Sequence, residues 1–102
     1  MNKKLAEAKP SKHIKQLCEE LGPLYSVQTI DREYVIYRDF GNGFDVEICS
    51  MDTGGFRKLA TLYLWYQKTR IVKTIYDVHQ NGISDHIDEL YALAQRGETA
   101  LD

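Results

Sequence analysis

The sequence predicts a small α+β domain, in which an N-terminal and a C-terminal helix pack on an antiparallel sheet of three or four strands in meander order. Three observations support this fold class. Short β-favouring runs fill the middle of the chain, glycine and asparagine separate them, and each end carries apolar residues at helical spacing. The 102 residues, 43% of them hydrophobic, suffice for one core. We therefore expect a single domain over residues 11–97, between a flexible basic segment at 1–10 and a tail at 98–102.

Capping signals delimit both predicted helices. Ser11 is a suitable N-cap and Gly22 a suitable stop for a first helix, whose apolar stripe comprises Ile14, Leu17, Cys18 and Leu21. A second helix is predicted from about Ser84 to Arg96, with Gly97 after its end. Acidic residues in its early turns stabilise the positive end of the helix dipole; these are Asp85, Asp88 and Glu89.

Four strands are predicted between the helices, at residues 34–40, 44–51, 59–66 and 71–78. Gly41, Asn42 and Gly43 join the first two, since glycine and asparagine adopt the positive φ angles of a tight hairpin. In the second strand, apolar residues alternate with Asp45 and Glu47, which predicts one buried and one solvated face.

Two segments leave the sheet open to more than one interpretation. Residues 59–66 are apolar on both faces, so this strand is either covered on both sides or displays aromatic side chains to solvent. Residues 25–30 are ambiguous between an irregular segment and an extra edge strand. The prediction is a sheet of three or four strands.

The charge distribution argues against a protein that mainly coats nucleic acid. The formal net charge is −2 and the isoelectric point is about 5.9, whereas such proteins usually carry a basic field. The first 15 residues nevertheless carry a local charge of +4, from Lys3, Lys4, Lys9, Lys12 and Lys15 against Glu7. We interpret this segment as solvated surface, with a phosphate-binding arm as the alternative.

The cysteines and the hydropathy pattern indicate a cytoplasmic protein. Cys18 and Cys49 lie on different predicted elements, and their spacing suggests neither a disulfide framework nor a zinc site. No apolar run follows the N-terminal lysines as it would in a signal peptide, and no stretch approaches the roughly 18 apolar residues of a membrane span. We expect reduced thiols and no contact with a membrane.

Candidate catalytic or metal-binding residues are weakly patterned. His79 and His86 lie near Asp77, Asp85 and Asp88, and imidazole with carboxylate is a suitable ligand set for a divalent metal. Their spacing matches no compact metal motif, so two ordinary surface histidines are the preferred interpretation. Cys49 beside one of these histidines would make a nucleophile and base, but no local signature accompanies it. We therefore predict no catalytic residue, metal or cofactor, and no enzymatic activity.

Aromatic residues are the main candidates for function. The chain has seven tyrosines, three phenylalanines and one tryptophan, and the strand pattern places four of them on one sheet face: Tyr37, Tyr63, Trp65 and Tyr76. Basic residues follow the expected rim, namely Arg38, Lys68, Arg70 and Lys73. Three interpretations stay open: burial within the domain, with one helix on each face or a second copy as cover; a protein-binding surface that includes self-association as a homodimer; and a platform that stacks nucleic-acid bases.

Two segments, REYVIYRDFGNGFDVEI at 32–48 and LATLYLWYQKTRIVKTIYDV at 59–78, resemble those of small accessory proteins of bacterial mobile elements, anti-CRISPR proteins among them. This resemblance implies an inhibitor that binds a CRISPR effector nuclease through surface residues. We predict a non-enzymatic protein-binding domain, with the contact residues Tyr37, Tyr63, Trp65, Arg70 and Tyr76. The alternative is a small nucleic-acid-binding protein that uses the basic N-terminal segment and the aromatic face.

Overall fold

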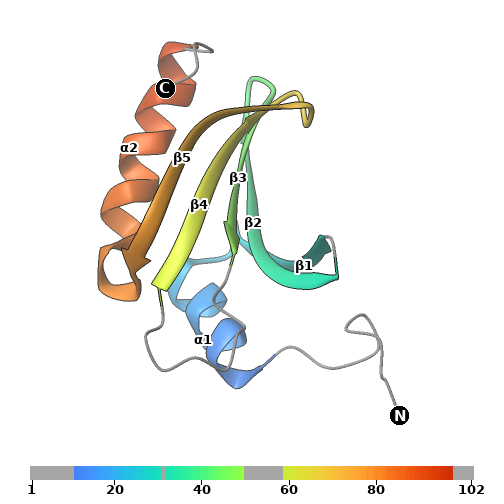
Figure 1. Cartoon of the computed structure of the whole chain (residues 1–102), viewed down its shortest axis with the longest axis vertical. Coiled ribbons are helices and arrows are strands. Elements are labelled where there is room, and N and C mark those ends of the chain that lie inside the picture. Colours follow the sequence, from blue (N-terminus) through green and yellow to red (C-terminus); the bar gives the residue numbers. More distant parts are fainter. Residues whose placement is uncertain (1–10, 31, 50–58, 98–102) are drawn as a thin grey trace.

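The computed structural model describes residues 11–30, 32–49 and 59–97, and in these ranges it forms an antiparallel five-stranded sheet with two α-helices (Figure 1). The strands are β1 (Ser26–Ile30), β2 (Glu33–Gly41), β3 (Phe44–Cys49), β4 (Leu59–Tyr66) and β5 (Arg70–His79). They lie in the sheet in sequence order, so the α+β class and the meander are confirmed. The predictions for 1–10, 98–102 and the last two residues of the strand at 44–51 lie outside the described residues.

The strand count of three or four is wrong because residues 26–30 form a true edge strand. Ser26 pairs with Tyr37 and Ile30 with Glu33, in a regular antiparallel register. The alternation of β1 is faint, since an edge strand of five residues buries few side chains and needs few apolar ones. The hairpin between β2 and β3 is as predicted, with φ angles of 86°, 56° and 85° at Gly41, Asn42 and Gly43.

The helices begin and end at the predicted capping residues, to within one position. Helix α1 (Lys12–Leu21) starts after Ser11, whose Oγ accepts the Ile14 N–H at 3.2 Å. A 3₁₀ turn, η2 (Gln80–Gly82), leads into α2 (Ile83–Arg96), which ends at Gly97 in the left-handed conformation with a φ of 71°. Neither helix within the described ranges is long and apolar enough to cross a membrane.

Both helices pack on the same side of the sheet, here called the helix face. Helix α1 contacts β1 and β2, while α2 lies alongside β5 and also contacts β3 (Figure 1). Ile14 of α1, Leu62 of β4 and Leu90 of α2 are fully buried in one continuous cluster. An arrangement with one helix on each face is therefore excluded. The opposite side of the sheet, which we call the open face, has no described helix over it.

Candidate functional site on the open face

The open face carries most of the aromatic residues that the sequence singles out. The register aligns Tyr37 of β2, Glu47 of β3 and Tyr63 of β4 in one row, and Asp45 of β3 with Trp65 of β4 in the next. Directly opposed residues of an antiparallel pair point to the same side, so these five residues share one surface. They alternate along their strands with core residues such as Val46 and Leu64, which belong to the helix-face cluster.

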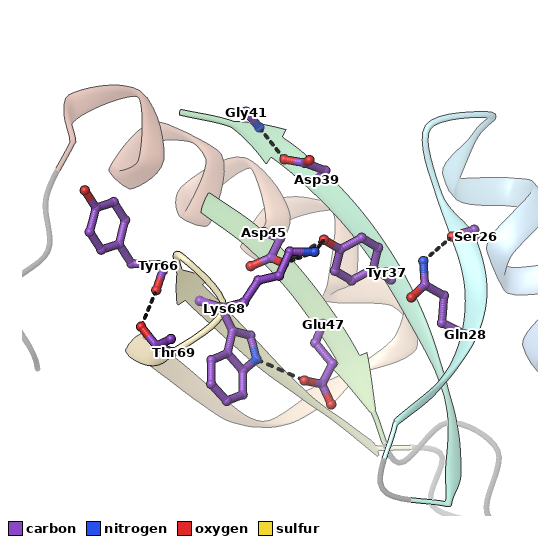
Figure 2. A network of polar contacts seen from close by, with 11 residues as sticks. Ser26, Gln28, Tyr37, Asp39, Gly41, Asp45, Glu47, Tyr66, Lys68 and Thr69 are labelled. Atoms are coloured by element: carbon purple, nitrogen blue, oxygen red, sulfur yellow. Dashed lines mark hydrogen bonds and ion pairs between the residues drawn. The ribbon is translucent and has the colours of Figure 1, made fainter. Parts of the chain in front are cut away.

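Two acidic residues in the middle of this face are buried. Asp45 and Glu47 are 5% and 7% exposed, so the prediction that this side of β3 is solvated is wrong. Tyr37 Oη donates to Asp45 Oδ2 at 2.6 Å, and Trp65 Nε1 donates to Glu47 Oε1 at 3.0 Å (Figure 2). These hydrogen bonds hold two large rings beside the carboxylates, which excludes water and replaces part of their hydration.

Lys68 brings a cation to the same place from the turn between β4 and β5. The turn covers residues 67–69, and its first two residues, Gln67 and Lys68, have positive φ angles of 54° and 61°. The Lys68 ammonium donates to Tyr37 Oη at 3.2 Å and lies 3.9 Å from Asp45 Oδ2 (Figure 2). Because the Lys68 side chain is 76% exposed, solvent screens this ion pair and it contributes little to stability.

The protonation states of this network follow from its contacts. Burial raises the pKa of the Tyr37 phenol, the hydrogen bond to the Asp45 carboxylate raises it further, and nearby Lys68 offsets part of the change. The hydrogen bond to Tyr37 is the largest cause that raises the pKa of Lys68, and the carboxylates of Asp45 and Asp39 add to it. At neutral pH, Tyr37 therefore keeps its proton and Lys68 its positive charge.

A small pocket opens beside this network, with a volume of about 250 Å³. Its lining comes from β1 to β4 and the β4–β5 turn: Gln28, Ile30, Tyr37, Asp45, Glu47, Trp65 and Lys68. Asp45 Oδ2 is bonded to Tyr37, whereas Asp45 Oδ1 is buried and has no hydrogen-bond partner among the described residues. A buried carboxylate oxygen without a donor is costly, so this atom marks a place where a donor from outside would be favourable.

The five predicted contact residues do not all come together. Tyr37, Tyr63 and Trp65 lie on the open face and are partly buried, and burial is the main cause that raises the pKa of Tyr63. Tyr76, 68% exposed, lies close enough to Tyr63 to contribute to the raised pKa of the Tyr63 phenol. The Arg70 guanidinium instead lies 5.8 Å from the ring centroid of Tyr66, a ring that packs on Phe44 in the core.

The predicted basic rim is also incomplete. Arg38 faces the helices, where its guanidinium carbon lies 4.9 Å and 5.2 Å from the ring centroids of Phe40 and Tyr91. Opposed residues share a face, and Arg38 is opposite buried Val46. Of the four basic residues expected at the rim, Lys68 is the one that lines the open-face pocket.

The other candidates for chemistry do not assemble within the described ranges. No group of three or more histidine, cysteine, aspartate or glutamate side chains there is arranged to hold a metal ion. His86 Nδ1 lies 3.3 Å from Glu89 Oε1 on the surface of α2. Cys49 directs its Sγ to the Thr61 carbonyl oxygen at 3.4 Å, across the β3–β4 pair.

Sequence reasoning missed Asp45 and Glu47 as parts of the site. Each was assigned to a solvated face because its immediate neighbours in the chain are apolar. The available signal was the pairing of an Asp-x-Glu strand with a Tyr-x-Trp strand, which puts a carboxylate opposite each ring once the register is known.

Comparison with protein-family models, with curated proteins and with solved structures finds no match for this chain.

Proposed function

We propose that this protein acts by binding another protein, without catalysing a reaction, and that the open face is its contact surface. The observation that carries the proposal is the set of partly exposed rings, Tyr63 and Trp65 above all, on a sheet face with no described helix over it. Tyrosine and tryptophan supply large rigid contact area with a polar group at one end, which is why they recur at interface hot spots.

The anti-CRISPR resemblance supports a definite form of this proposal, an inhibitor of a CRISPR effector nuclease in the bacterial cytoplasm. The two resembling segments, 32–48 and 59–78, cover β2 and β4 entirely and all but the last residue of β3 and of β5, and hence most of the open face. A nuclease holds phosphates with lysine and arginine side chains. The open face presents the carboxylates of Asp39, Asp45 and Glu47, so a basic channel of this kind is electrostatically complementary to it.

Nucleic-acid binding is the weaker alternative. Aromatic rings on a sheet favour base stacking. The carboxylates of Asp45 and Glu47 lie between those rings, however, and repel phosphate, while Arg38 faces the helices. A homodimer whose two-fold axis passes through the middle of the open face is disfavoured for a related reason, since residues near the axis meet their own copies and these carboxylates would repel each other.

The test is affinity capture with matched variants. The tagged full-length protein is incubated with lysate of a bacterium that carries a CRISPR system, with and without nuclease treatment, and bound proteins are quantified by mass spectrometry. Trp65→Ala and Tyr76→Ala remove rings from the open face. Leu24→Ala is the control, because Leu24 is a large hydrophobic residue, 67% exposed, that does not line the open-face pocket.

We expect a nuclease-resistant partner whose recovery falls at least about tenfold with Trp65→Ala, the effect of an interface hot spot, and is unchanged with Leu24→Ala. Tyr76→Ala separates lost binding from misfolding, because truncation of a side chain that is 68% exposed should leave the domain folded. If neither Trp65→Ala nor Tyr76→Ala reduces the recovery of the partner, the open face is not the contact surface. Partners that disappear after nuclease treatment, with binding that weakens steeply as salt rises and on deletion of residues 1–12, would establish the nucleic-acid alternative.

A further inference from the structure

We propose that the open-face pocket receives the guanidinium group of an arginine side chain from the partner protein. This inference rests on the proposed function and names the chemistry that its contact site recognises. The proposed ligands are the carboxylates of Asp45 and Glu47, and the flanking rings are those of Tyr37 and Trp65, all of which line the pocket.

Charge is the first argument. The pocket holds two carboxylates that are more than nine-tenths buried, and one ammonium, that of Lys68, whose side chain is 76% exposed. Asp45 Oδ1 lacks a hydrogen-bond partner among the described residues, although the atom is buried. An added cationic donor would pair this oxygen, which relieves the cost of a buried acceptor that has no hydrogen bond.

Lys68 occupies the mouth of the pocket only loosely. Its nitrogen lies 3.9 Å from Asp45 Oδ2, which is an ion-pair distance without a hydrogen bond. The same nitrogen lies 5.4 Å from the Tyr37 ring centroid, so a cation already stands within attractive range of that ring. Since the lysine stem is flexible and solvated, an incoming cation displaces it at little cost.

Arginine fits this pocket better than lysine does. A planar guanidinium stacks on aromatic rings and offers paired N–H donors to carboxylates, whereas an ammonium acts as a point charge. The helix face contains an arginine held in this way, because Arg38 lies near three rings and donates to Tyr25 Oη at 3.1 Å. The pocket volume of about 250 Å³ is below the range of roughly 300–1,000 Å³ typical of small-molecule sites, so it suits one side chain.

A titration with a minimal probe tests the site directly. Full-length ¹⁵N-labelled protein is titrated with N-acetyl-L-arginine methylamide, with the lysine counterpart, and with the citrulline counterpart, which has nearly the same shape and no charge. Trp65 is the one tryptophan of the chain, so its indole N–H gives a single assigned signal inside the pocket. We expect a saturable shift of this signal with the arginine probe, a weaker response to lysine and none to citrulline.

Variants of the charged residues sharpen the test. Asp45→Asn and Glu47→Gln keep the side-chain shape. Each is expected to lower the affinity for the arginine probe by about tenfold, through loss of a charge-assisted hydrogen bond. Lys68→Ala is expected to tighten binding by about two- to fivefold, because it removes a competing exposed cation. A gain of affinity cannot arise from misfolding, so this variant keeps the proposal testable if the buried-acid variants are unstable. Asp88→Asn, an exposed change on α2, is the matched control.

Two outcomes would overturn the proposal: an unmoved indole signal, or an equal response to citrulline. Partner capture separates this inference from the proposed function. If Trp65→Ala abolishes capture of the partner while Asp45→Asn and Glu47→Gln leave it intact, the open face is the contact surface but the arginine site is wrong. If the arginine probe binds as expected but Trp65→Ala does not reduce capture of the partner, the proposed function is wrong.

Discussion

Each face of the sheet has a cation beside aromatic rings, but the two cations differ in their neighbours and in their exposure to solvent. On the helix face, the Arg38 guanidinium carbon lies 4.9 to 5.4 Å from the ring centroids of Phe40, Tyr91 and Tyr25. On the open face, the cation is the exposed ammonium of Lys68, beside two buried carboxylates. The first cation is partly buried among three rings, whereas the second is exposed and open to exchange. The difference separates groups that stabilise the domain from groups that are available to a partner.

The largest expected effect is on the helix face. Leu64→Ala should lower the free energy of unfolding by about 2–5 kcal/mol, because Leu64 is fully buried in the cluster shared with the helices and its truncation leaves a cavity. Tyr76→Ala should change it by less than about 0.5 kcal/mol, since Tyr76 is 68% exposed. Urea unfolding monitored by circular dichroism measures both values. Similar losses for the two variants would contradict the division between the faces.

The two cations give the next largest contrast. Arg38→Ala should cost about 1–3 kcal/mol of unfolding free energy, from lost contacts with three rings and a lost hydrogen bond to Tyr25 Oη. Lys68→Ala should leave the stability unchanged within error, because water already solvates the ammonium. The same urea titrations measure this pair. A destabilised Lys68→Ala protein would show that the open-face cation is a structural part of the fold.

A smaller change in the free energy of unfolding is expected when one hydrogen bond of the open face is removed. Trp65→Phe retains an aromatic ring and removes the indole N–H that donates to Glu47 Oε1. The loss should be about 1 kcal/mol, the usual net value of one hydrogen bond. Thermal unfolding measures it, with Tyr63→Phe as the control for altering a polar group on the same face. A cost of several kcal/mol would place Trp65 with the core residues and count against its role as a contact residue.

The smallest effect is a pH dependence at the alkaline end. The pKa of Tyr37 is raised in the folded protein, from an ordinary value of 10.0. A group that holds its proton more tightly when folded stabilises the fold below its unfolded pKa, and this contribution is lost as the pH rises through the folded pKa. Stability should therefore fall as the pH rises above about 10. Tyr37→Phe should show a shallower decline, followed by urea midpoints and by tyrosinate absorbance; an identical slope would argue against the Tyr37 contacts.

Local signals were enough for the elements of the fold. Ser11, Asn42 and Gly97 lie at a cap, a turn and a helix end because each side chain suits the backbone conformation at its own position. The edge strand β1 was ambiguous for a related reason, since its stability comes from hydrogen bonds to β2 and not from its own apolar pattern. Three of its five residues are polar and the other two are only partly buried, which leaves little periodicity to detect.

The site could be predicted in part. Residues Tyr37, Tyr63 and Trp65 were found together because strand alternation determines which of them share a face. The burial of Glu47 was missed, since its indole partner lies 18 positions further along the chain. Arg38 and Arg70 were expected at the rim of the aromatic face, whereas their ring contacts hold them elsewhere.

The sequence by itself determined the α+β class, the meander, the ends of both helices and the aromatic character of one sheet face, because each depends on the spacing and backbone preferences of neighbouring residues. The tertiary structure alone decided that both helices cover the same face of the sheet. It also decided that Asp45 and Glu47 are buried beside aromatic rings on the open face. These features depend on which strands are adjacent and in which register, and that is settled by packing between residues far apart in the chain.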